Sequence, residues 1–221
     1  GPVHSESGLL QGHGVLIDQG RIAAIRPLSA FSPDLPAYDL QGQHLSAGFI
    51  DLQLNGCGGV MFNAAQTQET LAVMQEANLK SGTTSFLPTL ITSPDTDMRC
   101  AIEATRDYMQ AHPNQVLGLH LEGPYTNPIR KGIHPAAQIR HPTEDMIEYL
   151  CQNAPWIAKI TLAPEQNDLN HIRRLSEAGI LVAIGHSAAN YEQAIAGFNA
   201  GIRFATHLYN AMTPTLNGRE P

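Results

Sequence analysis

The sequence predicts an α/β protein built on a parallel β-sheet of the (β/α)8 type, the TIM barrel. From residue 47 onward, apolar segments of strand length alternate with segments of helical periodicity. The strands are almost continuously apolar, as expected for strands that are buried on both faces. Polar residues of catalytic type follow several different strands, which favours a barrel over a doubly wound sheet, because barrel active sites gather at the carboxyl ends of the strands.

The alternation defines the expected elements. Strands are expected at residues 48–54, 83–90, 116–122, 157–163, 180–186 and 202–208. Helices are expected at residues 68–80, 95–111, 144–153, 169–178 and 188–200, with Ser93 capping the second and Ser187 the last. A full barrel needs eight βα units and typically ~250 residues, so we expect about six of the eight strands and a barrel that is incomplete at its carboxyl end.

The first 46 residues have a different pattern. Two β-rich segments, residues 14–17 and 21–25, flank Asp18-Gln19-Gly20, and glycine there supplies the positive φ that a tight hairpin turn requires. We therefore expect residues 1–46 to be part of a small β-sandwich module and residues 47–221 to form the incomplete barrel.

Composition excludes several functional classes. The 221-residue chain is 43% hydrophobic and 15% charged with a net charge of -7, which is a globular composition. It lacks the clustered Lys and Arg of a nucleic-acid surface, and no apolar segment approaches the ~18 residues of a membrane span. Three widely spaced cysteines (Cys57, Cys100 and Cys151) form no paired-cysteine zinc motif and indicate a reducing, cytoplasmic setting.

Three of the expected strands end in residues that bind metal ions: Glu122, His186 and His207. Each has an ordinary alternative, since a lone Glu before Gly-Pro could cap a helix, and a histidine at a sheet edge could bond the backbone. The carboxyl ends of parallel strands meet at one edge of the barrel, however, so we expect the three to converge. One carboxylate and two neutral imidazoles match a catalytic zinc site with an open position, and they also suit iron, manganese or cobalt.

Further polar residues lie near the same edge. His120, two residues before the carboxylate, points to the same face one layer deeper, and we interpret it as a packed interior histidine. Gln53 and Asn55 share a face at the end of the first strand, but amides are weak ligands. His134 lies in the loop that follows the third strand, where substrate contacts are common; the alternative is a solvated loop. Arg219 could bind a phosphate or carboxylate, or simply lie on the surface.

These segments resemble the N-acetylglucosamine-6-phosphate deacetylases of the amidohydrolase superfamily. Residues 47–56 (AGFIDLQLNG) are similar to the first-strand signature of that family. Residues 119–124 (LHLEGP), 185–187 (GHS) and 206–212 (THLYNAM) are similar to its metal-site signatures, and residues 218–221 (GREP) to the start of a further segment. The resemblance runs from about residue 8 to the end of the chain.

The resemblance implies roles for individual residues. Glu122, His186 and His207 would hold one divalent metal ion, and zinc is the expected identity of that ion. Substrate contacts would come from Ile133, His134, Asn210 and Ala211. Arg219 would contact the phosphate of the substrate in a neighbouring subunit, which implies a homodimer. Gln53 and Asn55 occupy the places where many amidohydrolases have two histidines, which implies a single metal ion with these two amides beside its ligands.

The implied activity is hydrolysis of the acetamide of N-acetylglucosamine 6-phosphate to glucosamine 6-phosphate and acetate, a cytoplasmic step of amino-sugar catabolism and recycling. The family's catalytic aspartate follows the last barrel strand, and no acid of this sequence aligns with it. We therefore expect that aspartate beyond Pro221 and expect these residues alone to be inactive. The alternatives are a related amidohydrolase that acts on another N-acetyl sugar phosphate or a cyclic amide, and an inactive metal-binding fragment.

Overall fold

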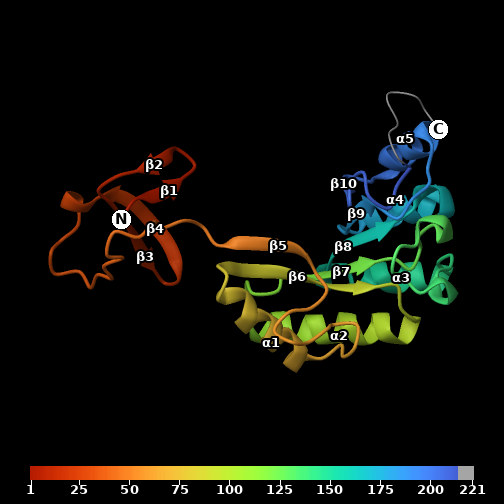
Figure 1. The fold of residues 1–221 in the computed structure, drawn as a ribbon, viewed down its shortest axis with the longest axis horizontal. Helices are drawn as coiled ribbons and strands as arrows, with labels where there is room; N and C mark the ends of the chain where they lie inside the picture. The colour runs from red at the N-terminus through yellow and green to blue at the C-terminus, as the bar shows by residue number, and fades with distance from the viewer. Residues whose placement is uncertain (214–221) are drawn as a thin grey trace. The chain divides into compact units, whose positions relative to one another are not determined.

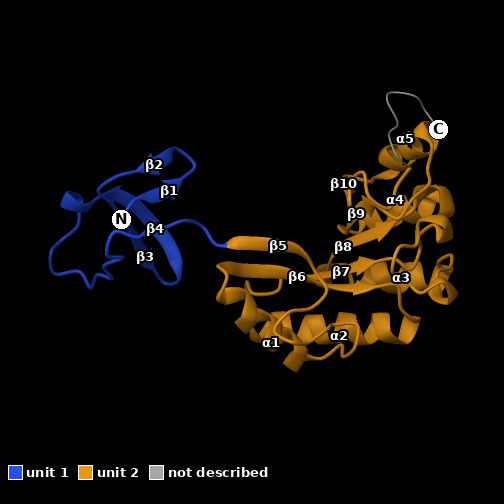
Figure 2. Cartoon of the chain, viewed as in Figure 1, with its two compact units in different colours: residues 1–48 blue, residues 49–221 orange. Residues whose placement is uncertain are grey.

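The computed structural model describes residues 1–213, and residues 214–221 lie outside the described part. The chain divides into two compact units, residues 1–48 and 49–221 (Figure 2). Within the described residues, no helix combines the length and the hydropathy that crossing a membrane would require. The assignment of residues 1–46 to a β-sandwich module stays a prediction.

The smaller unit consists of two antiparallel hairpins and a short 3-10 turn at Leu28–Ala30. The first hairpin pairs β1 (Val3–Ser5) with β2 (Gly8–Leu10), and the second pairs β3 (His13–Asp18) with β4 (Arg21–Pro27). Gln19 and Gly20 connect β3 to β4 with φ values of 48° and 73°. A two-residue hairpin turn whose twist matches that of its flanking strands requires positive φ at both central residues. The hairpin expected around Asp18-Gln19-Gly20 is therefore confirmed.

The larger unit is built on six parallel strands. They are β5 (Phe49–Leu54), β6 (Thr83–Ile91), β7 (Leu119–Glu122), β8 (Ile157–Leu162), β9 (Leu181–Ile184) and β10 (Phe204–Ala205). The strands lie in the order β5-β6-β7-β8-β9-β10, so each pairs with its neighbours in the sequence. The sheet curls into a half-barrel (Figure 1). The predicted α/β class and the six parallel strands are therefore confirmed.

Helices connect the strands. They are α1 (Gln68–Leu79), α2 (Asp95–Ala111), α3 (Glu144–Gln152), α4 (Leu169–Glu177) and α5 (Tyr191–Ala200). Figure 1 shows α1 and α2 running along one face of the β5–β7 part of the sheet. Every residue of β7 is buried. Because successive side chains of a strand alternate between faces, Leu119 and Leu121 lie on one face and His120 and Glu122 on the opposite one.

The last two strands are shorter than expected. β9 ends at Ile184 and β10 at Ala205, whereas the sequence predicted strands to residues 186 and 208. His186 and His207 have φ values of 49° and 54°, in the left-handed region that no β-strand continues through. Both histidines therefore lie in turns directly after their strands.

Two predicted helix caps were wrong, although α2 spans the predicted residues 95–111. α2 begins at Asp95 with Pro94, not Ser93, at the cap position. α5 is capped by Asn190, not Ser187, because Asn190 and Gln193 form a reciprocal capping box. The Asn190 side chain accepts from the Gln193 N–H at 2.9 Å, and the Gln193 side chain accepts from the Asn190 N–H at 3.0 Å. This pair satisfies two N–H groups at the start of the helix, whereas a cap at Ser187 would not.

Asn190→Ala should lower the free energy of unfolding by about 1 kcal/mol, because it leaves a helix N–H without its acceptor. Asn190→Ser is the control, since a serine hydroxyl restores the acceptor and should recover most of the loss. Urea unfolding of the two variants measures the difference. Equal stability of the two variants would show that this cap does not stabilise α5.

Candidate metal centre

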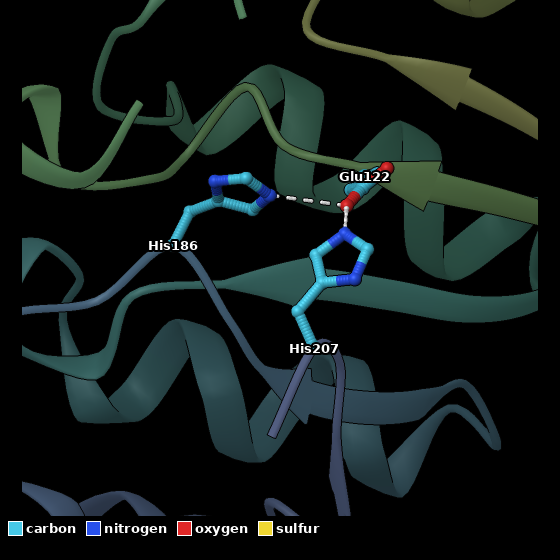
Figure 3. A group of neighbouring side chains, drawn as sticks. All are labelled: Glu122, His186 and His207. Carbon is cyan, nitrogen blue, oxygen red and sulfur yellow. Dashed lines mark hydrogen bonds and ion pairs between the residues drawn. The ribbon is translucent and has the colours of Figure 1, made fainter. Parts of the chain in front are cut away.

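Glu122, His186 and His207 converge on one point at the carboxyl edge of the sheet (Figure 3). Glu122, the last residue of β7, is 2% exposed. Its Oε1 lies 3.1 Å from His186 Nε2 and 2.6 Å from His207 Nε2. One ligand atom from each of the three residues lies within 4.8 Å of the other two. The structure thus brings together the three residues that the sequence predicted to converge.

The ring of His186 is oriented by a backbone carbonyl. Its Nδ1 lies 2.8 Å from the oxygen of Arg130. A carbonyl oxygen only accepts hydrogen bonds, so Nδ1 carries a proton and Nε2 of the neutral ring presents a lone pair toward Glu122. A lone pair and a carboxylate oxygen 3.1 Å apart repel each other unless a positive charge, either a proton or a metal ion, lies between them. The donor set therefore fits a cation.

The local electrostatics keep Glu122 ionised. Burial raises the pKa of its carboxyl group, but the hydrogen bond with His186 and the charges of nearby histidines act in the opposite direction, and the pKa falls to about 2. For His186, burial lowers the pKa, while the bonds to Glu122 and to the Arg130 carbonyl raise it, and the net direction is upward. The site thus favours negative charge on the carboxylate and positive charge beside it.

Gln53 of β5 holds the other oxygen of the carboxylate. Its Nε2 donates to Glu122 Oε2 at 3.0 Å and lies 3.3 Å from His207 Nε2. This contact leaves Oε1 to face the two histidines. Asn55 follows β5 at the same edge, and its backbone oxygen accepts from the Phe62 N–H.

His134 also faces the site. It is 1% exposed, and its Nε2 lies 3.9 Å from Glu122 Oε1. The backbone N–H of Thr92 donates to His134 Nδ1 at 3.4 Å, and the Thr92 hydroxyl lies 2.8 Å from the same nitrogen. Burial lowers the pKa of His134 to about 4, so the ring is neutral. Since a backbone N–H only donates, Nδ1 is the acceptor and the ring proton is on Nε2, directed into the site.

His120 lies beneath the site in a chain of hydroxyl groups. Its Nδ1 is 3.1 Å from Thr89 Oγ1 and its Nε2 is 2.7 Å from Thr161 Oγ1, which in turn lies 2.8 Å from Thr206 Oγ1. Burial lowers the pKa of His120 to about 3. Both ring nitrogens are occupied by protein partners, as the interpretation of a packed interior histidine requires.

Three of the residues expected to contact substrate lie in loops next to His134 and His207. Ile133, next to His134, is 86% exposed. Asn210 and Ala211 follow His207 closely, and the Ala211 carbonyl accepts from the Ser187 N–H at 3.1 Å. Arg219 lies outside the described residues.

Sequence reasoning missed two groups that orient histidines of the site. Thr92 follows β6 directly, as the other polar residues follow their strands, so the same rule could have found it. The Arg130 carbonyl carries no side-chain signal, because any residue would supply that oxygen.

Comparison with known proteins places this geometry in a family. Residues 44–217 match the amidohydrolase family. The chain belongs to that family. This amidohydrolase is 48% identical over 218 residues to N-acetylglucosamine-6-phosphate deacetylase of Haemophilus influenzae, covering 99% of this chain and 57% of that protein. It is 37% identical to N-acetylgalactosamine-6-phosphate deacetylase of Shewanella sp. strain ANA-3, covering 99% and 56%.

A solved structure agrees with these relatives. N-acetylglucosamine-6-phosphate deacetylase of Pasteurella multocida superimposes with a TM-score of 0.95 at 48% identity, covering 98% of this chain and 57% of that one. The chain thus spans a little more than half the length of the relatives it matches. The amidohydrolase family uses a divalent metal ion, and Glu122, His186 and His207 form a group that could hold one.

The His134 ring should be the Nε2–H tautomer in the metal-free protein near pH 8, because its Nδ1 accepts from Thr92. Nitrogen-15 chemical shifts of the imidazole, assigned by comparison with His134→Gln, distinguish the two tautomers. Thr92→Val keeps the backbone N–H and should keep the tautomer. Detection of a proton on Nδ1 would contradict this account of the site.

Proposed function

We propose that the full-length protein hydrolyses the acetamide of N-acetylglucosamine 6-phosphate and releases acetate. The observation that carries the proposal is the convergence of Glu122, His186 and His207, in a chain 48% identical to a deacetylase of that substrate. The gluco epimer is favoured over the galacto epimer because the galactosamine relative is only 37% identical over a similar stretch.

Glu122, His186 and His207 would hold one divalent metal ion, which we propose to be zinc, since a carboxylate and two neutral imidazoles are typical ligands of catalytic zinc. When bound, such an ion polarises a carbonyl group and lowers the pKa of a coordinated water molecule. Gln53 keeps Oε2 of Glu122 occupied, so the ligand oxygen Oε1 stays directed at the histidines. Asn55 lies beside the site without being a ligand.

The other residues bind and orient the substrate. His134 presents its Nε2 proton toward the site and would donate it in a hydrogen bond to an oxygen of the substrate. Ile133, Asn210 and Ala211 lie on the loops that flank the metal group and would contact the sugar. The proton-transferring aspartate that the family resemblance places beyond Pro221 stays a prediction.

Arg219 would bind the phosphate group of the substrate through two parallel charge-assisted hydrogen bonds. The resemblance assigns this contact to the site of a neighbouring subunit, so we also propose a homodimer. We also propose a cytoplasmic location, which the three free cysteines and the proposed phosphorylated substrate support.

His186→Ala should lower the affinity of the full-length protein for Zn2+ by at least ~100-fold and abolish deacetylation, because it removes one of three protein ligands. Equilibrium dialysis with metal analysis measures the binding, and release of acetate measures the activity. His171→Ala is the matched control, since His171 on α4 pairs with Glu144 on the surface. Stoichiometric metal and full activity in His186→Ala would disprove the assignment.

Arg219→Ala should reduce kcat/KM for N-acetylglucosamine 6-phosphate by roughly 10- to 100-fold, because that is the fold-change that corresponds to losing a charge-assisted hydrogen bond. It should leave the low activity on unphosphorylated N-acetylglucosamine unchanged. Arg173→Ala, on the exposed face of α4, is the control. Equal turnover of phosphorylated and free sugar by the wild type, or faster turnover of the galacto epimer, would contradict the proposed substrate.

A further inference from the structure

Glu165 accepts hydrogen bonds from two separate loops. It lies in the 3-10 turn η5 (Pro164–Gln166) that follows β8. Its Oε1 accepts from Asn127 Nδ2 at 2.9 Å and from the Ala188 N–H at 2.6 Å, and its Oε2 accepts from Ser187 Oγ at 2.7 Å. One half-buried carboxylate thus connects the loops that follow β7, β8 and β9.

These bonds surround His186. Ser187 and Ala188 follow it in the chain, and the backbone N–H of Asn127 donates to the His186 carbonyl at 2.8 Å. Ser187 Oγ, while donating to Glu165, also accepts from the Ala189 N–H at 3.0 Å. Glu165 therefore holds two segments: the residues that follow His186, and the loop after β7, whose Asn127 contacts the His186 carbonyl.

The backbone of His186 needs such support. Its φ of 49° lies in the left-handed region, which is unfavourable for a residue with a side chain and persists only where the surrounding structure holds it. The segment before it is held by the sheet, since the Gly185 N–H donates to the Leu162 carbonyl at 3.1 Å. A Cβ on Gly185 would lie 2.6 Å from Thr161 Cγ2, so the chain is closely packed there. Glu165 provides the matching restraint on the other side.

The chemistry of the three donors explains why the residue is a carboxylate. A side-chain amide, a backbone N–H and a hydroxyl converge on it, and all three are neutral. An ionised carboxylate has two acceptor oxygens and no donor, so it satisfies all three at once. Hydrogen bonds to an ionised acceptor are also stronger than those between neutral groups.

We propose that Glu165 is a positioning residue that holds His186 in the orientation needed for metal binding. The proposal rests on the metal site of the proposed function, because it requires His186 to be a ligand. Glu165 acts through Asn127, Ser187 and Ala188, and it does not touch the metal group itself. Partners bonded directly to metal ligands commonly contribute 10- to 100-fold to metal affinity, and Glu165 acts on His186 through one further contact.

Glu165→Ala should therefore weaken Zn2+ binding by about 10-fold, the lower end of the range for partners bonded directly to a ligand. Glu165→Gln should rescue most of that loss, because its amide oxygen can still accept from Asn127 and Ala188, while its NH2 group donates to the Ser187 hydroxyl. Competition with a chromophoric chelator, on metal-stripped full-length protein well below its unfolding temperature, measures the dissociation constant. Thermal unfolding of the stripped variants separates lost stability from lost affinity.

Glu144→Ala is the matched control. Glu144 also accepts from two side chains, His171 and Arg174, but lies on the exposed face of α3, so its removal should leave Zn2+ affinity unchanged. Wild-type affinity in folded Glu165→Ala would overturn the proposal. A stability loss alone, with no change in affinity, would do the same.

Two further variants keep the test decisive. If Glu165→Ala does not fold, Ser187→Ala removes one of the three bonds and should give a smaller rise in the dissociation constant; unchanged affinity there overturns the proposal. If His186→Ala loses the metal but Glu165→Ala binds it with wild-type affinity, the positioning role of Glu165 is rejected and the proposed metal site is kept. Full metal binding by His186→Ala rejects the proposed metal site itself.

Discussion

The structure depends on the burial of one ionised carboxylate. Moving a carboxylate out of water costs several kcal/mol even after the surrounding protein relaxes. Glu122 is 2% exposed, and its Oε1 faces two imidazole nitrogens. The His186 ring donates its proton from Nδ1 to the Arg130 carbonyl, so its Nε2 has no proton to donate to Glu122. The carboxylate and the two imidazoles are therefore stable side by side when a cation lies between them. The burial of Glu122 thus turns the end of β7 into a site that selects positive charge.

The sheet order makes this convergence possible. β7 lies inside the sheet, between β6 and β8, and its apolar side chains Leu119 and Leu121 are fully buried. The opposite face carries polar groups in layers, with His120 and its threonine partners below and Glu122 above. The lower layer is closed by its own hydrogen bonds, whereas the upper layer leaves ligand atoms directed at one point. The same strand therefore supplies both the packed support and the chemistry above it.

Much of the sheet and of the metal centre was predictable from local patterns in the sequence. Apolar strands alternating with helical segments gave the six parallel strands, and polar residues at strand ends located Glu122, His186 and His207. Local patterns failed where a contact joins distant segments. Ser187 looked like a helix cap because serine often caps helices, yet its hydroxyl binds Glu165, 22 residues away. The left-handed conformation of His186 and His207 was also missed, because positive φ is uncommon in every non-glycine residue, histidine included, and residue type alone does not predict it.

The distance in sequence between Glu122 and His207 has a consequence for how the protein is made. The two residues are 85 positions apart. At a synthesis rate of about 5–20 residues per second, the carboxylate leaves the ribosome roughly 4 to 17 seconds before its histidine partner. During that interval Glu122 has Gln53 and then His186 as partners, but it lacks the second imidazole that its Oε1 faces in the folded protein. The group of Glu122, His186 and His207 can therefore be complete only after the chain has been made through β10 to His207.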